Sequence, residues 1–175
     1  MLAVRGVVVH HTKGRGDPYD IARGHTLDRG WPGIAYHFVI MGGPGASSVF
    51  QTLPLDMASY HAGLHNRTRI GIAIVGDYDR GKPYPNDLHA CAWLCGVLCL
   101  ALDLKDPADW VGPVILPGRV VAGHRELFGA TTKIGKTCPG KRFNMNELRE
   151  LTALRMIDIG ATDALDHGIR FPQGD

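Results

Sequence analysis

At 175 residues, 45% of them hydrophobic and 21% charged, the chain has the size and composition of one globular domain with its own core, which excludes an intrinsically disordered protein. A formal net charge of +2 is too small to indicate nucleic-acid binding by charge alone. No stretch approaches the roughly 20 apolar residues of a membrane span. The segment Met1–Val9 is too short for a secretory signal peptide.

The first predicted element is a strand over residues 6–10, a β-branched apolar run that ends at His10. We expect this strand to be buried on both faces. A short helix follows over about residues 18–27, with Asp17 as its N-cap and a proline in its first turn. The helix should end before Gly30.

The middle of the chain predicts more strands and a long helix. A second strand is expected over residues 35–40 and an antiparallel hairpin partner over 47–52, because glycine and proline separate the two runs. Residues 69–75 form a third apolar run, which we place at the centre of the sheet. A long buried helix is expected over residues 86–102, where apolar residues recur at helical spacing behind Asn86 as N-cap.

The last third of the chain is dominated by a predicted long loop over residues 123–143. A loop of this length inside a compact domain usually carries function. A short strand over 119–122 precedes the loop. A closing helix follows it, capped by Asn144 or Asn146 and running to residue 157.

The order of these elements predicts an α/β fold, a single domain with a central mixed β-sheet flanked by helices. No internal repeat and no linker argues for a second domain. We place this domain at residues 1–158. Residues 159–175 are expected to form a loosely packed or extended tail.

Three of the four cysteines, Cys91, Cys95 and Cys99, recur every four residues inside the apolar run of the long helix. They share one helical face, and a thiol in such a place behaves as a small hydrophobic group, so we expect them to pack in the core. Cys138 differs, because it lies in the glycine- and proline-containing segment 136–140. Thiolate chemistry is a more natural role than packing there.

Three residues at strand ends or in loops have the side chains of a catalytic zinc site, namely His10, His124 and Cys138. Such a site takes three protein ligands and leaves a fourth position for water. One long and one short gap separate these residues along the chain, which excludes the clustered ligand pairs of a zinc finger. The pattern alone leaves open whether the three residues meet. If they do, the zinc site lies in a groove at the edge of the sheet.

Several sequence motifs occur in order along the chain: Val8-Val-His-His-Thr12, Ala35-Tyr-His-Phe-Val-Ile40, Tyr60-His-Ala-Gly63 with Asn66 and Ile70-Gly-Ile72, Gly123-His-Arg125 and Lys136-Thr-Cys-Pro-Gly140. Together they resemble the type 2 N-acetylmuramoyl-L-alanine amidases, a superfamily that includes phage lysozymes with amidase activity and the peptidoglycan recognition proteins. The phage-lysozyme type is the most similar. The resemblance spans roughly residues 5–157.

The resemblance implies a zinc-dependent amidase that cuts the bond between N-acetylmuramic acid and L-alanine, with one Zn²⁺ held by His10, His124 and Cys138. Members that bind peptidoglycan without cutting it lack the cysteine, so Cys138 indicates an active enzyme. The resemblance also assigns catalytic roles to Tyr36 and Lys136, whose hydroxyl and ammonium groups suit a developing oxyanion. Taken as residues alone, they are equally a half-buried strand tyrosine and a solvated lysine. The proton donor to the leaving nitrogen stays unassigned.

Substrate contacts are implied by the same resemblance for Thr12, His61 and Asn66. The residues themselves leave alternatives open. Thr12 and Asn66 can tie down turns, and His61 can be an exposed loop histidine. We interpret His11 and His37 as structural, hydrogen-bonded residues, because each alternates away from a motif position on its strand.

Other functions compete with the amidase hypothesis: a non-catalytic peptidoglycan-binding module, a muropeptide-recycling amidase, and a regulator that binds a polymerase. Recycling relatives generally use an aspartate as third ligand, and the regulator needs a segment before the first strand that is not seen here. The expected partner is peptidoglycan, without nucleic acid or membrane insertion, and the chain is expected to be a monomer. Since no signal peptide is recognised, we expect synthesis in the cytoplasm and action on the cell wall after release, as in a phage endolysin.

Overall fold

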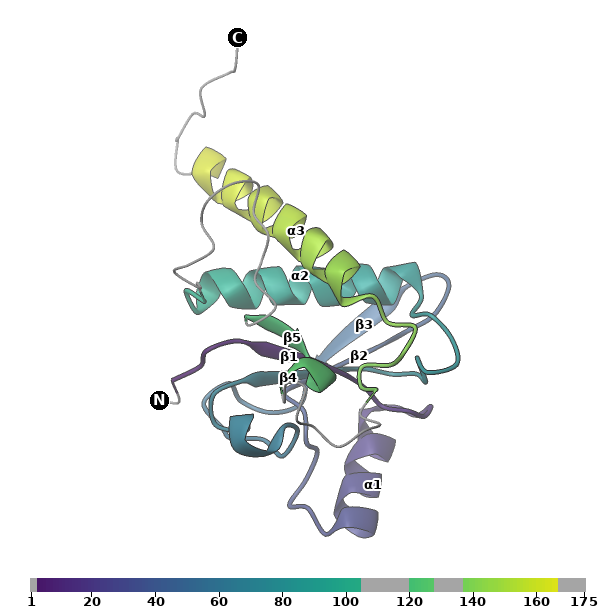
Figure 1. The fold of residues 1–175 in the computed structure, drawn as a ribbon. Helices are drawn as coiled ribbons and strands as arrows, with labels where there is room; N and C mark the ends of the chain where they lie inside the picture. The colour runs from purple at the N-terminus through teal and green to yellow at the C-terminus, as the bar shows by residue number, and fades with distance from the viewer. Residues whose placement is uncertain (1–2, 105–119, 128–136, 167–175) are drawn as a thin grey trace.

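The computed structural model describes residues 3–104, 120–127 and 137–166. Its centre is a five-stranded sheet in the order β3-β2-β4-β1-β5 (Figure 1). Strands β2, β4, β1 and β5 are parallel and β3 is antiparallel to β2, so the sheet is mixed, as predicted. The strands are β1 (Val7–His11), β2 (Phe38–Gly42), β3 (Ser47–Gln51), β4 (Ile70–Ile74) and β5 (Val121–Gly123).

The two central strands, β1 and β4, are buried along their whole length. Both are short apolar runs, which is typical of parallel strands covered on both faces. Their register pairs Val9 with Ile72 and His10 with Ala73. The valines therefore fix β1 in the core, and the strand delivers its histidines at its carboxyl end.

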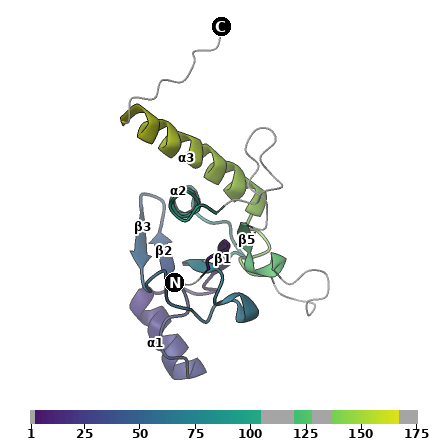
Figure 2. The same ribbon diagram turned by 90° about the vertical axis from the view of Figure 1, so that its left-hand side faces the viewer.

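Helices lie on both sides of the sheet (Figure 1). They are α1 (Pro18–Arg29), α2 (Pro85–Ala101) and α3 (Met145–Asp166). Figure 2 shows α2 nearly end-on between the sheet and α3, with α1 on the opposite side. The contact between α2 and α3 is close at Gly96, where an added Cβ would lie 3.5 Å from side-chain atoms of α3. Within the described residues, no helix combines the length and the apolar character needed to cross a membrane.

The predicted packing of the three helical cysteines is confirmed. Cys91, Cys95 and Cys99 are buried free thiols on α2. They belong to the same apolar cluster as Leu94 and Leu98 and the central strands. Each leucine buried in this way contributes about 1.5 to 3 kcal/mol, so this face of α2 is a main source of stability.

The first helix begins and ends as predicted, whereas the second has a different N-cap from the predicted one. Asp17 caps α1 through a capping box, and Gly30 ends it in the left-handed conformation at φ 65°. The predicted cap Asn86 is wrong, because Tyr84 occupies the N-cap of α2 without a side-chain hydrogen bond. Pro85 follows as the first helical residue, where its fixed φ and missing N–H suit a helix start.

The closing helix is capped by the first of the two predicted asparagines. Asn144 Oδ1 accepts hydrogen bonds from the backbone N–H groups of Asn146 (3.1 Å) and Glu147 (3.3 Å). The predicted end at Ile157 is wrong, because α3 continues to Asp166. A single glycine in this extension costs a helix only about 1 kcal/mol, which its alanine and leucine neighbours can offset. The predicted boundary between domain and tail thus falls inside α3.

Candidate metal centre and active site

Two of the predicted ligands lie side by side at the carboxyl edge of the sheet. β5 includes Gly123, past the predicted end of that strand at Ala122, and Gly123 pairs with Val9 of β1. The next residue along the chain is a histidine in both cases, His10 within β1 and His124 directly after β5, so the parallel pairing brings the two together. Their ring centroids are 4.5 Å apart. His10 is only 2% exposed.

The third predicted ligand, Cys138, comes from the loop before α3. Its Sγ lies 3.5 Å from His10 Nδ1. One ligand atom from each of His10, His124 and Cys138 lies within 4.8 Å of the other two, so these residues can hold a metal ion together. Two imidazole nitrogens and one sulfur are donors that Zn²⁺ accepts, and three ligands leave a fourth position open.

The protonation state of the Cys138 thiol depends on whether a cation is bound beside it. Burial raises the pKa of Cys138 to about 11, although a backbone hydrogen bond from His11 and the nearby Lys13 oppose the shift. The thiol therefore keeps its proton at neutral pH unless a cation is present, whereas a coordinated thiol is deprotonated outright.

His61 fixes the ring of His10 from behind. His61 Nε2 is 3.0 Å from the Arg69 carbonyl oxygen, which can only accept a hydrogen bond. The proton of His61 must then be on Nε2, and burial lowers its pKa to about 3, so the ring is neutral. Its Nδ1 accepts from His10 Nε2, 2.9 Å away. This chain of hydrogen bonds assigns the proton of His10 to Nε2, so Nδ1, the atom near Cys138, is unprotonated, as a metal ligand must be.

Tyr36 lies in the cavity beside the ligands, with its ring centroid 5.3 Å from that of His10. The strand predicted over residues 35–40 begins only at Phe38. The N–H groups of Thr52 and Leu53 both donate to the His37 carbonyl, so the regular hydrogen bonding between the two strands ends at that residue. Burial, and to a lesser extent Cys138, raises the pKa of Tyr36 to about 12. The phenol therefore stays protonated at neutral pH and can donate a hydrogen bond into the cavity.

The cavity measures about 220 Å³, and the three candidate ligands line it together with Tyr36 and His61. One rim is aromatic and cationic, which the sequence analysis missed. Trp31 and Tyr60 are stacked with centroids 6.3 Å apart, and the Arg29 guanidinium lies 5.1 Å from the Trp31 ring centroid. The cavity thus has the apolar faces of aromatic rings beside the three polar candidate ligands.

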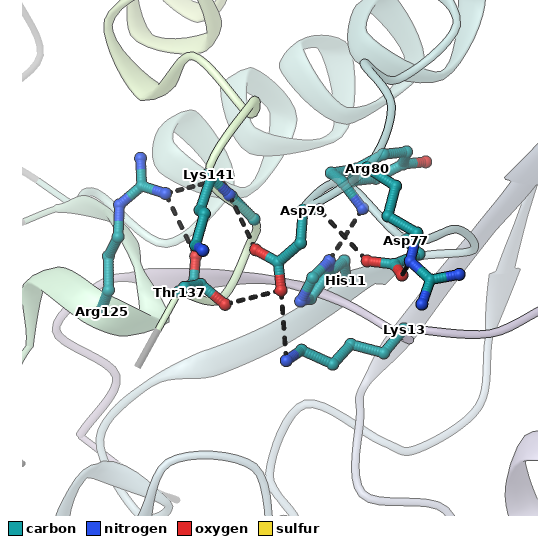
Figure 3. Close-up of polar contacts among 10 residues, drawn as sticks. His11, Lys13, Asp77, Asp79, Arg80, Arg125, Thr137 and Lys141 are labelled. Carbon is teal, nitrogen blue, oxygen red and sulfur yellow. Dashed lines mark hydrogen bonds and ion pairs between the residues drawn. The ribbon is translucent and has the colours of Figure 1, made fainter. Parts of the chain in front are cut away.

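Arg125, next to the ligand His124, holds the loop that carries Cys138 (Figure 3). Its backbone N–H donates to the Cys138 carbonyl at 2.8 Å. Its guanidinium donates to the carbonyls of Thr137 and Phe143, both at 3.1 Å, and to that of Gly140. Although this arginine belongs to a recognised motif, its role depends on contacts with a distant loop and gave no signal in the sequence.

Asp79 holds the same loop from the other side, and the sequence analysis missed it as well (Figure 3). Its carboxylate accepts from the Lys141 N–H at 3.0 Å and from the Thr137 hydroxyl at 2.8 Å, and it pairs with Lys13 at 3.2 Å. Partial desolvation by itself would raise the pKa of Asp79. The bonds from Lys141, Thr137 and Lys13 outweigh this effect and lower the pKa to about 2. The carboxylate is therefore charged at neutral pH and can accept all of these bonds.

The residues predicted to touch substrate lie in different settings. His61 is 7% exposed, so it is a buried residue and not an exposed loop histidine. Thr12 lines the cavity, and its hydroxyl accepts from the Gly76 N–H at 3.1 Å. Asn66 Oδ1 accepts a backbone N–H at 2.6 Å and ties down a turn away from the cavity lining. The predicted catalytic residue Lys136 lies outside the described residues.

His11 and His37 are buried and hydrogen-bonded, as expected. His11 Nδ1 accepts from the Tyr78 N–H at 3.1 Å, while its Nε2 has no partner among the described residues. His37 Nδ1 accepts from the Gly71 N–H at 3.0 Å, and its Nε2 lies 2.9 Å from the Met57 carbonyl. Burial lowers the pKa of both imidazoles. Both rings connect backbone segments that surround the site.

The sequence matches the family model of the N-acetylmuramoyl-L-alanine amidases over residues 1–141. A curated relative, a peptidoglycan-recognition protein of Drosophila simulans, is 25% identical over 158 residues, which cover 86% of this chain and 75% of the relative. The solved structure of the Ph2119 endolysin from Thermus scotoductus bacteriophage Ph2119 is 27% identical, with a TM-score of 0.64, and the match covers 85% of this chain and 84% of that one. The N-acetylmuramoyl-L-alanine amidase LysC from Clostridium intestinale shares the fold, with a TM-score of 0.66, 24% identity and coverage of 84% and 83%.

The residues matched by the family model include all three candidate ligands and Tyr36. The resemblance first seen in separate motifs therefore extends over most of the chain, and the predicted superfamily is confirmed. The chain belongs to the N-acetylmuramoyl-L-alanine amidase family, in the superfamily that also contains the peptidoglycan recognition proteins.

Proposed function

We propose that this chain is a zinc-dependent amidase that hydrolyses the bond between N-acetylmuramic acid and L-alanine in peptidoglycan. The observation that carries the proposal is the group of His10, His124 and Cys138, whose ligand atoms lie within 4.8 Å of one another and line an open cavity. The similarity to an N-acetylmuramoyl-L-alanine amidase and to a phage endolysin supports the same reaction and a role in cell-wall lysis.

Zinc bound to these residues supplies an activated water and polarises the scissile carbonyl. His61 accepts a hydrogen bond from Nε2 of His10. The proton of His10 therefore stays on Nε2, and Nδ1 of the same ring remains unprotonated. Tyr36 keeps its proton at neutral pH, so its hydroxyl donates a hydrogen bond to the carbonyl oxygen as negative charge develops there. We assign Lys136 to the same oxygen on the family pattern alone.

Substrate contacts are part of the proposal. Thr12 and His61 line the cavity, and we propose that both contact the substrate there, His61 through its ring carbons because both of its nitrogens are hydrogen-bonded. Asn66 is better placed to shape the turn after His61, because its side-chain oxygen accepts the Ala62 N–H. We infer that its effect on substrate is indirect.

A second candidate function is recognition of peptidoglycan without cleavage, which the similarity to a peptidoglycan-recognition protein favours. A binding module needs the cavity but has no need of a third metal ligand. Cys138 therefore separates the two functions. Hydrolysis of soluble muropeptides is a further variant of the amidase proposal, and it differs only in the size of the substrate.

The test measures free alanine amino groups released from purified peptidoglycan and, in parallel, from soluble muropeptides. Wild type and Cys138→Ser are compared after metal removal and again after zinc is returned, with Asp158→Asn on the exposed surface of α3 as a control. We expect release only by zinc-loaded wild type and control. Wild type that binds the wall but releases nothing with zinc present would support the recognition module.

A further inference from the structure

Cys138 differs from the other two candidate ligands in how the fold holds it. His10 belongs to β1 and His124 directly follows β5, so the sheet fixes both backbones. Cys138 lies in a turn together with Pro139, in a segment without strand or helix. Its place must come from contacts of this segment with the rest of the molecule, through both backbone and side chains.

We propose that Asp79 is a positioning residue that anchors the Cys138 loop and so sets the sulfur in place for the metal. The inference rests on the proposed zinc site. Asp79 touches none of the three ligands in any hydrogen bond of the described residues, and it acts through Thr137 and Lys141.

The geometry of the anchor is a single carboxylate that binds both sides of the turn around Cys138. Oδ2 of Asp79 accepts from the hydroxyl of Thr137, the residue before the cysteine, at 2.8 Å. Oδ1 accepts from the N–H of Lys141, beyond the turn, at 3.0 Å. The turn itself closes through the Gly140 N–H and the Thr137 carbonyl at 2.6 Å. A turn held at both ends leaves Cys138 little freedom to move.

Asp79 is itself fixed to the end of the central sheet. Its N–H donates to Asp77 Oδ1 at 3.1 Å, and the preceding Tyr78 donates its N–H to Nδ1 of the buried His11 at 3.1 Å (Figure 3). The loop also rests directly on this segment, because the Arg142 N–H donates to the Tyr78 carbonyl at 2.9 Å. These hydrogen bonds therefore connect β1, which carries His10, to the loop that carries the Cys138 sulfur, and fix the two relative to each other.

Lys13 contributes less to the anchor than its ion pair with Asp79 suggests. The Lys13 side chain is 59% exposed, and ion pairs in such settings contribute little. Arg125 supports the loop independently by donating to three of its carbonyls. Loss of Asp79 should thus loosen the loop without releasing it. We expect metal affinity to fall by about 10- to 100-fold, the usual effect of losing a group that orients a ligand.

The experiment measures binding of zinc by competition with a chromophoric chelator, and of Co²⁺ through its thiolate charge-transfer band. Asp79→Ala should bind both metals about 10- to 100-fold more weakly and lose part of the thiolate band. The matched pair is Thr137→Val and Thr137→Ser. The valine lacks the hydroxyl that donates to Asp79 and should weaken binding, whereas the serine keeps it and should restore wild-type affinity. Neither change alters a charge, so the pair separates anchoring from the electrostatic effect of a carboxylate near the metal.

Two further variants complete the design. Lys13→Met and the distant surface variant Asp158→Asn should keep the metal affinity within a few-fold of wild type. Failure of wild type to bind metal overturns the proposed zinc site itself. Normal binding and a normal thiolate band in folded Asp79→Ala, or equal affinities of Thr137→Val and Thr137→Ser, overturn the anchoring role. If Asp79→Ala does not fold, the threonine pair decides.

Discussion

Replacing His61 by alanine removes both hydrogen bonds by which it orients His10, the first candidate ligand. The wild-type ring links the Arg69 carbonyl (3.0 Å) to His10 Nε2 (2.9 Å) in a place where His61 is 7% exposed. His61→Ala leaves the buried His10 N–H without its acceptor, which costs about 1 to 3 kcal/mol. Without this hydrogen bond to orient the imidazole, metal affinity should fall by about 10- to 100-fold. That loss corresponds to about 1.4 to 2.7 kcal/mol, the same size as the cost of the unpaired N–H.

Two measurements test this expectation. Zinc affinity is determined by chelator competition, and the free energy of unfolding by urea denaturation in the presence of chelator. His61→Asn serves as the matched variant, because its side-chain oxygen can take the place of the imidazole Nδ1 and accept from His10. We expect it to recover part of the affinity. The reasoning fails if folded His61→Ala binds zinc as tightly as wild type.

Other expectations concern the surroundings of the site. An added Cβ at Gly71 would lie 2.7 Å from Cγ of His61, so Gly71→Ala should displace that ring. We expect the free energy of unfolding, measured by urea denaturation, to fall by about 1 to 3 kcal/mol. A variant as stable as wild type would contradict the close fit. Burial raises the pKa of Asp87, and the hydrogen bond from Ser47 opposes the shift only in part. The folded state therefore binds the proton of this carboxyl group more tightly than the unfolded state does, and the free energy of unfolding falls as the pH rises through the raised pKa. Asp87→Asn should remove this part of the pH dependence, measured by urea unfolding from acid to neutral pH, and an unchanged profile would refute the assignment. Tyr36→Phe should lower kcat by roughly 100- to 1,000-fold if its hydroxyl supports the oxyanion, and unchanged steady-state hydrolysis would remove it from the mechanism.

The parts of the fold that sequence predicts well are those decided by local pattern. The buried strands β1 and β4 are short runs rich in β-branched residues, and such runs have few alternatives in a parallel sheet. The helix starts at Asp17 and Asn144 follow from side chains that accept backbone N–H groups a few residues away. The start of α2 was missed because Pro85 and Asn86 both suit a helix start, and only the structure shows that the proline is the first helical residue.

The burial of His61 illustrates what local pattern leaves out. In the sequence it belongs to an irregular polar stretch, which is typical of an exposed loop. It is buried because Gly71, inside β4, has no side chain and the imidazole fills that space. A glycine within a strand often marks such a close approach, so this signal was present in the sequence. It does not indicate which residue approaches.

Asp79 and Arg125 were missed for a related reason, and the strand order explains why both matter. β1 lies between β4 and β5 in the sheet, and all three strands are parallel, so their carboxyl ends meet at one edge. The end of β1 gives His10, and the end of β5 gives His124 and then Arg125. The chain beyond β4 gives Asp79. The two neighbours of β1 therefore hold opposite sides of the loop that brings Cys138 to His10. A third ligand without a strand of its own is held in this way by anchors from both flanking strands, so residues that are not ligands contribute to the geometry of the site.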